Sequence, residues 1–178
     1  MKVRVDQITD EVKRRVFTEP AEGINRRLTR GDVCDFRLLA PLSVDTTYYR
    51  AGDDLFFSGQ IVGSFEGTCA RCLEPFALGL DEKAQFVLVP APTGAADREL
   101  SADDLALSFY EGEEIDLSPL FTEQAILTLP TRALCGEECR GLCPECGANR
   151  NHETCSCGEP EPDQRFAVLR NLRVERSS

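Results

Sequence analysis

Several features are scarce or missing in this chain of 178 residues. It has no tryptophan, which argues against a large aromatic ligand cage, and its single histidine leaves few candidates for general acid–base catalysis. Charges stand among the first six residues, where a secretory signal would be apolar, and no apolar run approaches the roughly 18 residues of a membrane span. We therefore expect a cytoplasmic protein that does not act at a membrane.

The common signatures of catalysis are also missing. The sequence contains no phosphate-binding glycine loop, no HExxH, no serine elbow and no dinucleotide fingerprint. These absences predict a protein that is not an enzyme and takes no small-molecule substrate.

Positive charge is in deficit, since the formal net charge is −11. A chain of this charge is a poor general binder of RNA. The balance is uneven, because residues 1–50 carry ten Lys/Arg against eight Asp/Glu. Local basic residues therefore supply the candidate contacts with RNA or a protein partner, although a solvated charged surface explains such clusters as well. The candidates are Arg14, Arg15, Arg26, Arg27 and Arg71.

Cysteine, by contrast, is abundant, with nine residues. In a reducing cytosol such a number indicates metal or catalytic chemistry before disulfides. Eight of the nine form four close pairs, and two pairs of thiolates make one closed tetrahedral zinc site, so we predict about two zinc ions and no open catalytic position. The predicted ligands are Cys69, Cys72, Cys135, Cys139, Cys143, Cys146, Cys155 and Cys157.

The spacing of the pairs leaves their combination open. Proximity favours residues 143 and 146 with 155 and 157, which leaves 69 and 72 to meet 135 and 139, but residues 135–146 could also form one local site. The single residue between Cys155 and Cys157 strains joint ligation, and His152 is a possible substitute. The unpaired Cys34 is interpreted as a small buried apolar residue. The Cys69–Cys72 pair has a rival interpretation as a thiol redox pair, which should then lie between a strand and a helix.

Alternating apolar and polar residues predict an α+β fold built on an antiparallel β-meander. Strands are expected over residues 33–49, limited by Pro41, and over 55–65 and 76–89, with a turn at 51–54. Residues 3–5 resemble an edge strand, residues 8–17 a brief helix or irregular excursion, and residues 105–110 a short strand.

A helix is predicted over residues 119–129, with Ser118 as its N-cap and Pro130 after its end. Its apolar residues should cover the sheet; they are Leu120, Phe121, Ala125, Ile126 and Leu127. The expected organisation is a core domain over 1–134, a zinc-binding segment with a zinc-knuckle module over 135–158, and a helical tail over 159–178.

With these motifs in place, the chain resembles the YceD family, the large ribosomal RNA subunit accumulation proteins of bacteria. The resemblance rests on residues 67–74 (GTCARCLE), 115–117 (IDL), 127–130 (LTLP), 139–147 (CRGLCPECG), 155–157 (CSC) and 163–165 (DQR). Gln164 departs from the proline usual in the family.

The resemblance implies a factor in large ribosomal subunit biogenesis that supports accumulation of 23S ribosomal RNA. Some family members lack the segment matching 143–157, which supports the pairing of 69 and 72 with 135 and 139. The expected partner is 23S ribosomal RNA or a basic large-subunit ribosomal protein, the latter through the acidic region 97–123. The alternatives are a cytosolic thiol oxidoreductase using Cys69 and Cys72, and a zinc-stabilised adaptor unrelated to ribosomes.

Overall fold

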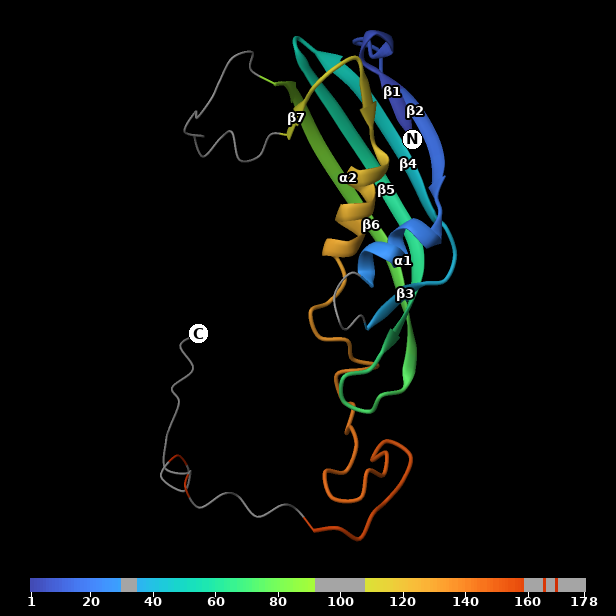
Figure 1. Ribbon diagram of the computed structural model, residues 1–178, viewed down its shortest axis with the longest axis vertical. Coiled ribbons are helices and arrows are strands. Elements are labelled where there is room, and N and C mark those ends of the chain that lie inside the picture. Colours follow the sequence, from blue (N-terminus) through green and yellow to red (C-terminus); the bar gives the residue numbers. More distant parts are fainter. Residues whose placement is uncertain (30–34, 92–107, 159–164, 166–168, 170–178) are drawn as a thin grey trace.

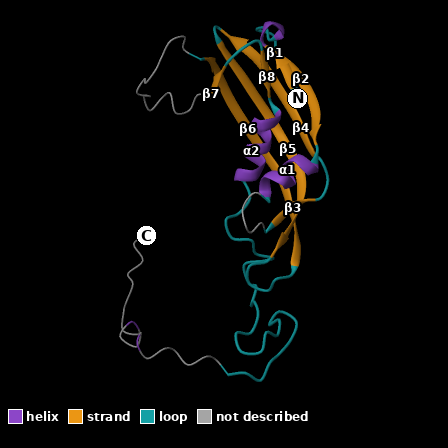
Figure 2. Ribbon diagram, in the orientation of Figure 1, coloured by secondary structure: helices purple, strands orange, loops and turns teal. Residues whose placement is uncertain are grey.

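The computed structural model describes residues 1–29, 35–91, 108–158, 165 and 169. These residues form an α+β fold, as predicted, in which a curved sheet carries two helices on one face (Figure 1). The larger sheet has the strand order β2-β4-β5-β6-β7, with β3 also paired to β5. Figure 2 shows that residues 128–158, which follow α2, are loop and continue beyond the end of the sheet. Among the described residues, no helix is long and apolar enough to cross a membrane.

The centre of the sheet is the predicted antiparallel meander. Its strands are β4 (Leu42–Ala51), β5 (Asp54–Thr68) and β6 (Pro75–Pro90). A tight turn joins β4 to β5, and Gly52 supplies the positive φ of 65° that this turn needs. The alternation of buried and exposed residues along β4 and β5 gives the sheet one apolar face, as the sequence predicts.

Three further strands flank the meander. The short β3 (Phe36–Leu38) pairs with the far end of β5, and it ends before Pro41, so the predicted strand 33–49 is two strands in its described part. β7 (Ser108–Tyr110) pairs with β6 in parallel, so the sheet built around the predicted antiparallel meander is mixed. β1 (Lys2–Arg4) and β8 (Glu114–Asp116) form a separate two-stranded sheet. A 3-10 turn, Val5–Gln7, directly follows β1.

The prediction for residues 8–17 is wrong, because β2 (Lys13–Glu19) begins within that range and pairs with β4 along its whole length. Its basic residues Arg14 and Arg15 are exposed, and an edge strand tolerates such charges. The sequence reasoning also missed α1 (Ala21–Leu28), which begins directly after Pro20. α1 buries only Ile24, and its Asn25 side chain exchanges two hydrogen bonds with the backbone of Leu38, at 3.0 and 2.8 Å.

α2 (Ser118–Leu127) is the predicted helix, with two corrections. Leu117 occupies the N-cap position instead of Ser118, whose backbone N–H donates to Oδ1 of Asp116 at 3.1 Å. Phe121 and Ala125 are fully buried against the sheet, but Leu127 is 71% exposed and covers nothing.

The core lies between the inner face of the sheet and α2. Phe121 is its centre, because its ring meets Phe17 and Phe86 edge-on, with centroids 5.9 and 5.3 Å away. Edge-to-face pairs of this kind stabilise beyond their buried area. α2 is thereby fixed on the sheet, and with it the position at which the following cysteine loop starts. β7 lies within the predicted strand 105–110, whereas Cys34, residues 105–107 and nearly all of the predicted helical tail lie outside the described residues.

Candidate metal centre

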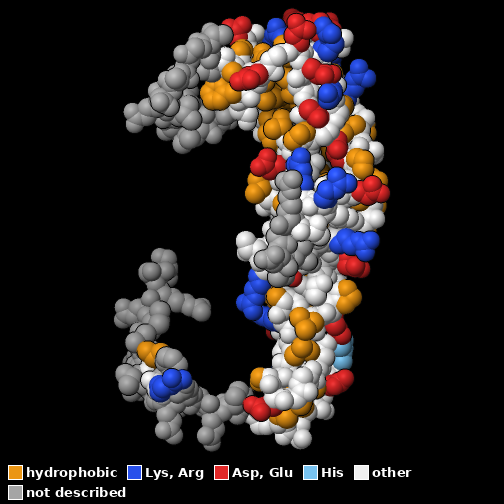
Figure 3. Space-filling model, viewed as in Figure 1, with side chains coloured by type: hydrophobic (Ala, Val, Ile, Leu, Met, Phe, Trp, Pro, Cys, Tyr) orange, Lys and Arg blue, Asp and Glu red, His pale blue; other side chains and the backbone are white. Residues whose placement is uncertain are grey.

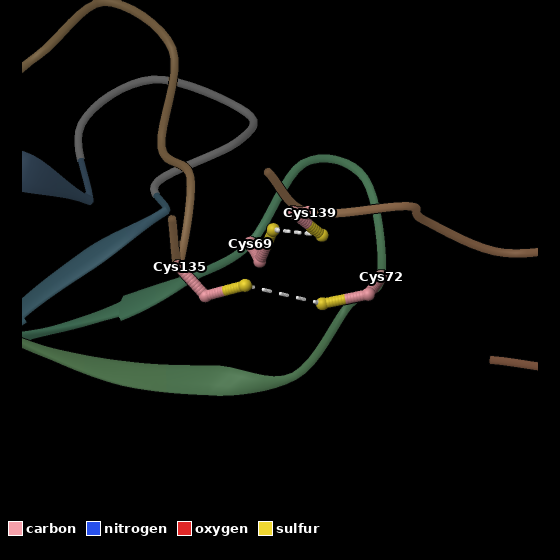
Figure 4. A group of neighbouring side chains, drawn as sticks. All are labelled: Cys69, Cys72, Cys135 and Cys139. Carbon is pink, nitrogen blue, oxygen red and sulfur yellow. Dashed lines mark hydrogen bonds between the residues drawn. The ribbon is translucent and has the colours of Figure 1, made fainter. Parts of the chain in front are cut away.

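Two separate segments bring four cysteine sulfurs together at the end of the sheet. Cys69 and Cys72 lie in the connection between β5 and β6, whereas Cys135 and Cys139 lie in the loop that follows α2 (Figure 4). Their sulfur atoms all lie within 4.8 Å of one another. Cys69 is fully buried, and Cys72 and Cys139 are nearly so. We call these four residues the first group.

The spacing of the sulfurs fits a tetrahedral metal site and is too long for disulfides. The Sγ atoms of Cys69 and Cys139 are 3.8 Å apart, and those of Cys72 and Cys135 are 3.7 Å apart. A tetrahedral ion with zinc–sulfur bonds of about 2.3 Å holds its ligands about 3.8 Å from each other. A disulfide needs about 2.05 Å. The donor set and its spacing therefore fit zinc.

Backbone hydrogen bonds shape the turn that carries Cys69 and Cys72. The N–H of Leu73 donates to the carbonyl of Cys69 at 2.9 Å, and the N–H of Cys69 donates to the carbonyl of Glu74, also at 2.9 Å. The N–H of Arg71 points at Cys69 Sγ, 3.5 Å away. This path requires a left-handed residue at position 73, where Leu73 has a φ of 62°. A residue with a Cβ is strained there by roughly 1–2 kcal/mol.

The side chain of Arg71 binds the loop that carries Cys135 and Cys139, the second cysteine pair of the first group. Its Nη1 donates to the carbonyls of Glu137 and Cys139, at 2.8 and 3.0 Å. The N–H of Ala70 donates to the carbonyl of the buried Ala133 at 2.8 Å. The hairpin thus binds the backbone on both sides of the Cys135–Cys139 loop. Arg71, which the sequence predicts to contact a partner, thus also has an internal role, and its contact with a partner stays a prediction.

The second group joins the remaining pairs, Cys143 with Cys146 and Cys155 with Cys157, and its sulfurs also lie within 4.8 Å of one another. The turn at Cys143 repeats the backbone pattern of the first: the N–H of Gly147 donates to the carbonyl of Cys143 at 2.9 Å. Gly147 has a φ of 75°, so glycine stands here where Leu73 stands in the first turn.

The grouping of the sulfurs is therefore the one that sequence proximity favours, and the local alternative over residues 135–146 does not form. Both Cys155 and Cys157 reach the second group in spite of their single spacer. His152 lies outside it: the side chain is 64% exposed, and its Nε2 is 3.1 Å from Oε2 of Glu74. Metal ligation by all eight cysteines stays a prediction.

Crowding of the thiols spreads their pKa values in both groups. Burial raises the pKa of Cys69, but hydrogen bonds from the backbone of Cys135, Cys72 and Arg71 outweigh it and lower the value to about 6. Its neighbour Cys135 shares a hydrogen bond with Cys139, and this bond with burial raises the pKa of Cys135 to about 12. Each thiolate makes the next one harder to form, and a bound cation would remove this conflict.

The pKa values of the second group are spread in the same way. Backbone hydrogen bonds from Cys146 and Glu145 lower the pKa of Cys143 to about 6, and the hydrogen bond with Cys146 raises that of Cys157 to about 12.

In the first group, the side-chain amide of Asn151, which the sequence reasoning missed, donates a hydrogen bond to Cys139 and lowers the pKa of that thiol. No sequence pattern marks Asn151, since it belongs to no cysteine pair.

Comparison with known proteins decides the family. Residues 57–173 match the family described as "Large ribosomal RNA subunit accumulation protein YceD", and this range includes both cysteine groups. The chain belongs to the YceD family. The family is thus associated by its name with accumulation of large-subunit ribosomal RNA.

Relatives of the YceD chain occur in Arabidopsis thaliana, in Zea mays and in Mycobacterium species. The chloroplastic YCED homolog 1 of Arabidopsis thaliana is 28% identical over 194 residues, covering 94% of this chain and 57% of the relative. An uncharacterized protein of Mycobacterium tuberculosis is 31% identical over 108 residues, covering 61% of this chain and 51% of the relative. The chain spans about half the length of the curated relatives it matches. No solved structure matches it.

The other arginines predicted to meet a partner lie outside both cysteine groups. Arg14 on β2 is paired with Asp45 of β4, and this pairing lowers the pKa of the Asp45 carboxyl. Arg15, Arg26 and Arg27 are exposed. Figure 3 shows Lys and Arg side chains mixed with Asp and Glu over the visible face, without one large basic patch. Their contact with RNA or a protein stays a prediction.

Proposed function

We propose that this chain is a non-enzymatic zinc-binding factor of large ribosomal subunit biogenesis that supports accumulation of 23S ribosomal RNA. The observation that carries the proposal is the match to the YceD family over residues 57–173. The two groups of four cysteines support the zinc part, because four thiolates complete a tetrahedral shell and leave no position for a substrate.

Zinc in the first group would act as a crosslink. It would join the β5–β6 turn to the loop after α2, segments that are more than 60 residues apart in sequence but have sulfurs 3.7 Å apart. Because such a site does not exist in the unfolded chain, the free energy of zinc binding would add to the stability of the fold. Zinc in the second group would add to the backbone hydrogen bonds that shape the turn at Cys143, such as those of Gly147 and Leu142, and would hold residues 155 and 157 against that turn.

The charge of the chain limits the surfaces through which it could contact RNA or a protein. At a net charge of −11, the chain would approach RNA only through local basic residues such as Arg15, Arg26 and Arg27. Its acidic remainder suits a basic large-subunit ribosomal protein equally well. We propose contact with one of these two partners during assembly, in the cytoplasm.

The rival interpretation as a thiol oxidoreductase gains no support from the surroundings of its cysteine pair. Cys69 and Cys72 lie in a connection between two antiparallel strands, whereas a thioredoxin-like pair precedes a helix. Each sulfur also has a cysteine of the other pair within 3.8 Å. A metal site uses such a quartet, and a two-cysteine redox cycle does not require it.

Depletion of the protein in cells that encode it tests the proposal. We expect less mature large-subunit RNA and fewer 50S particles on a sucrose gradient, restored by the wild-type chain but not by a Cys72→Ser chain. An Arg132→Ala chain, changed at an exposed residue outside both groups, is the control and should restore the profile. Unchanged gradients after depletion would overturn the proposal.

A further inference from the structure

The side chain of Asn151 links the two cysteine groups. Its Nδ2 donates to Sγ of Cys139 in the first group at 3.4 Å, and its Oδ1 accepts from the N–H of Arg140 at 2.8 Å. One exposed amide therefore holds both the sulfur of a ligand and the backbone that follows it. Asn151 itself lies between the two pairs of the second group in sequence.

The position of Asn151 is set by the second group's own turn. The N–H of Cys143 donates to the carbonyl of Ala148 at 2.8 Å, and Asn149 forms an isolated bridge with Leu142. The side-chain oxygen of Asn149 then accepts from both the N–H and Nδ2 of Asn151, at 3.1 and 2.9 Å. Loss of order at Cys143 would therefore release the amide that contacts Cys139.

A second connection fixes the turn against the hairpin. The N–H of Leu142 donates to the carbonyl of Arg71 at 3.0 Å, and Gly141 lies so close to that carbonyl that a Cβ would be 2.9 Å from it. Arg71 in turn holds the carbonyl of Cys139. The two groups thus share one continuous set of hydrogen bonds.

An N–H donor aimed at a ligating sulfur matters because four thiolates around one Zn²⁺ leave a net charge of −2. Partners that orient a ligand and offset this charge commonly change metal affinity by about 10–100-fold when removed. Asn151 is such a partner for Cys139. It is supplied by a segment whose shape depends on a different group of cysteines.

We propose that Asn151 is a positioning residue for metal bound by the first group, and that metal in the second group raises the first group's affinity through it. The proposal rests on the zinc binding proposed above. Since coupling between binding sites is reciprocal, metal in the first group also strengthens the second. The second group then acts as a support for the metal that holds the sheet to the helix.

The test uses cadmium-113 bound to the full chain, because each four-sulfur site gives its own resonance. Cys72→Ser and Cys146→Ser variants assign the two signals. A competing chelator is then added stepwise to Asn151→Ala and to a matched control, Arg150→Ala, whose side chain is exposed. We expect the first group's signal to disappear at about tenfold less chelator in Asn151→Ala and at an unchanged concentration in the control.

The coupling is tested in a chain carrying Cys143→Ser and Cys146→Ser. The first group should lose metal about as easily as in Asn151→Ala, and adding Asn151→Ala should change little more. Asn151→Asp, which keeps the shape but replaces the donor with a carboxylate, should bind more weakly than Asn151→Ala. A first-group signal equally resistant in Asn151→Ala and Arg150→Ala would overturn this inference and leave the zinc proposal standing. A chain that binds no metal would overturn both.

Discussion

Alanine in place of Gly141 should separate the second cysteine group from the hairpin. Gly141 has a φ of 68°, which costs a residue with a Cβ roughly 1–2 kcal/mol. The added Cβ would also lie 2.9 Å from the carbonyl oxygen and 3.3 Å from the Cβ of Arg71. Movement that relieves this contact would break the hydrogen bond from Leu142, which contributes about 1 kcal/mol. The total cost to the docked state is about 2–4 kcal/mol.

Two other glycines distinguish the cost of backbone strain from the cost of the close contact with Arg71. Gly147 has a positive φ but open space around its Cβ position, so Gly147→Ala should carry the strain alone, roughly 1–2 kcal/mol. Gly136 has neither a positive φ nor a close neighbour, so Gly136→Ala should change little. The order of effect expected from the structure is Gly141, Gly147, Gly136.

Hydrogen exchange at the Leu142 amide of the metal-loaded chain measures the effect. This amide is protected by the carbonyl of Arg71, so a loss of 2–4 kcal/mol should speed its exchange by about 30- to 700-fold in Gly141→Ala. Gly147→Ala should give a smaller increase, and Gly136→Ala almost none. Equal exchange rates in Gly141→Ala and Gly136→Ala would refute the docking geometry.

Three further predictions concern the sheet, the first turn and its thiols. Gly59→Ala places a Cβ 2.6 Å from a buried ring of α2 and should lower the free energy of unfolding by about 1–3 kcal/mol in urea, whereas Gly79→Ala, in open space, should cost nothing; equal midpoints would contradict this. Leu73→Gly should be more stable than Leu73→Ala by about 0.5–1 kcal/mol on thermal unfolding, because glycine accepts the φ of 62° without strain; the reverse order would contradict it. Zinc binding at pH 7 should release protons, because hydrogen bonds with neighbouring thiols raise the pKa of Cys135 and Cys157 to about 12 and only thiolates bind, so apparent affinity should rise with pH; heats of binding that do not depend on the buffer would argue against it.

The sequence was sufficient for the centre of the sheet. The approximate alternation in residues 55–65, the strand-like run at 76–89 and the turn at Gly52 identified the hairpins, because one face of the sheet is buried and side chains on that face recur every second residue. It failed at β2, where three basic residues mask a strand whose stability comes from pairing with β4. Such pairing depends on a distant partner, which local propensity does not reveal.

At α1 and at the candidate site, too, the sequence showed local patterns but not the contacts between distant residues. α1 is only eight residues long, and its apolar side consists of Ala21, Ile24 and Leu28, so the pattern is too short to distinguish a helix from a loop in the sequence. Sequence proximity favoured the observed cysteine grouping but left a local site over residues 135–146 open, because spacing along the chain does not fix which pairs the fold brings together. The roles of Arg71 and Asn151 were not, since both act through backbone carbonyls or a sulfur brought near by the fold. The left-handed φ of Leu73 was equally hidden, because leucine gives no signal for it.

Metal content is the most direct test of the central claim. The chain, purified without chelator, should contain two zinc ions, and X-ray absorption should show four sulfurs at about 2.3 Å around each. Cys72→Ser should lose four-sulfur coordination at one ion and Cys146→Ser at the other. A chain without metal that forms a reversible disulfide between Cys69 and Cys72 would contradict the account.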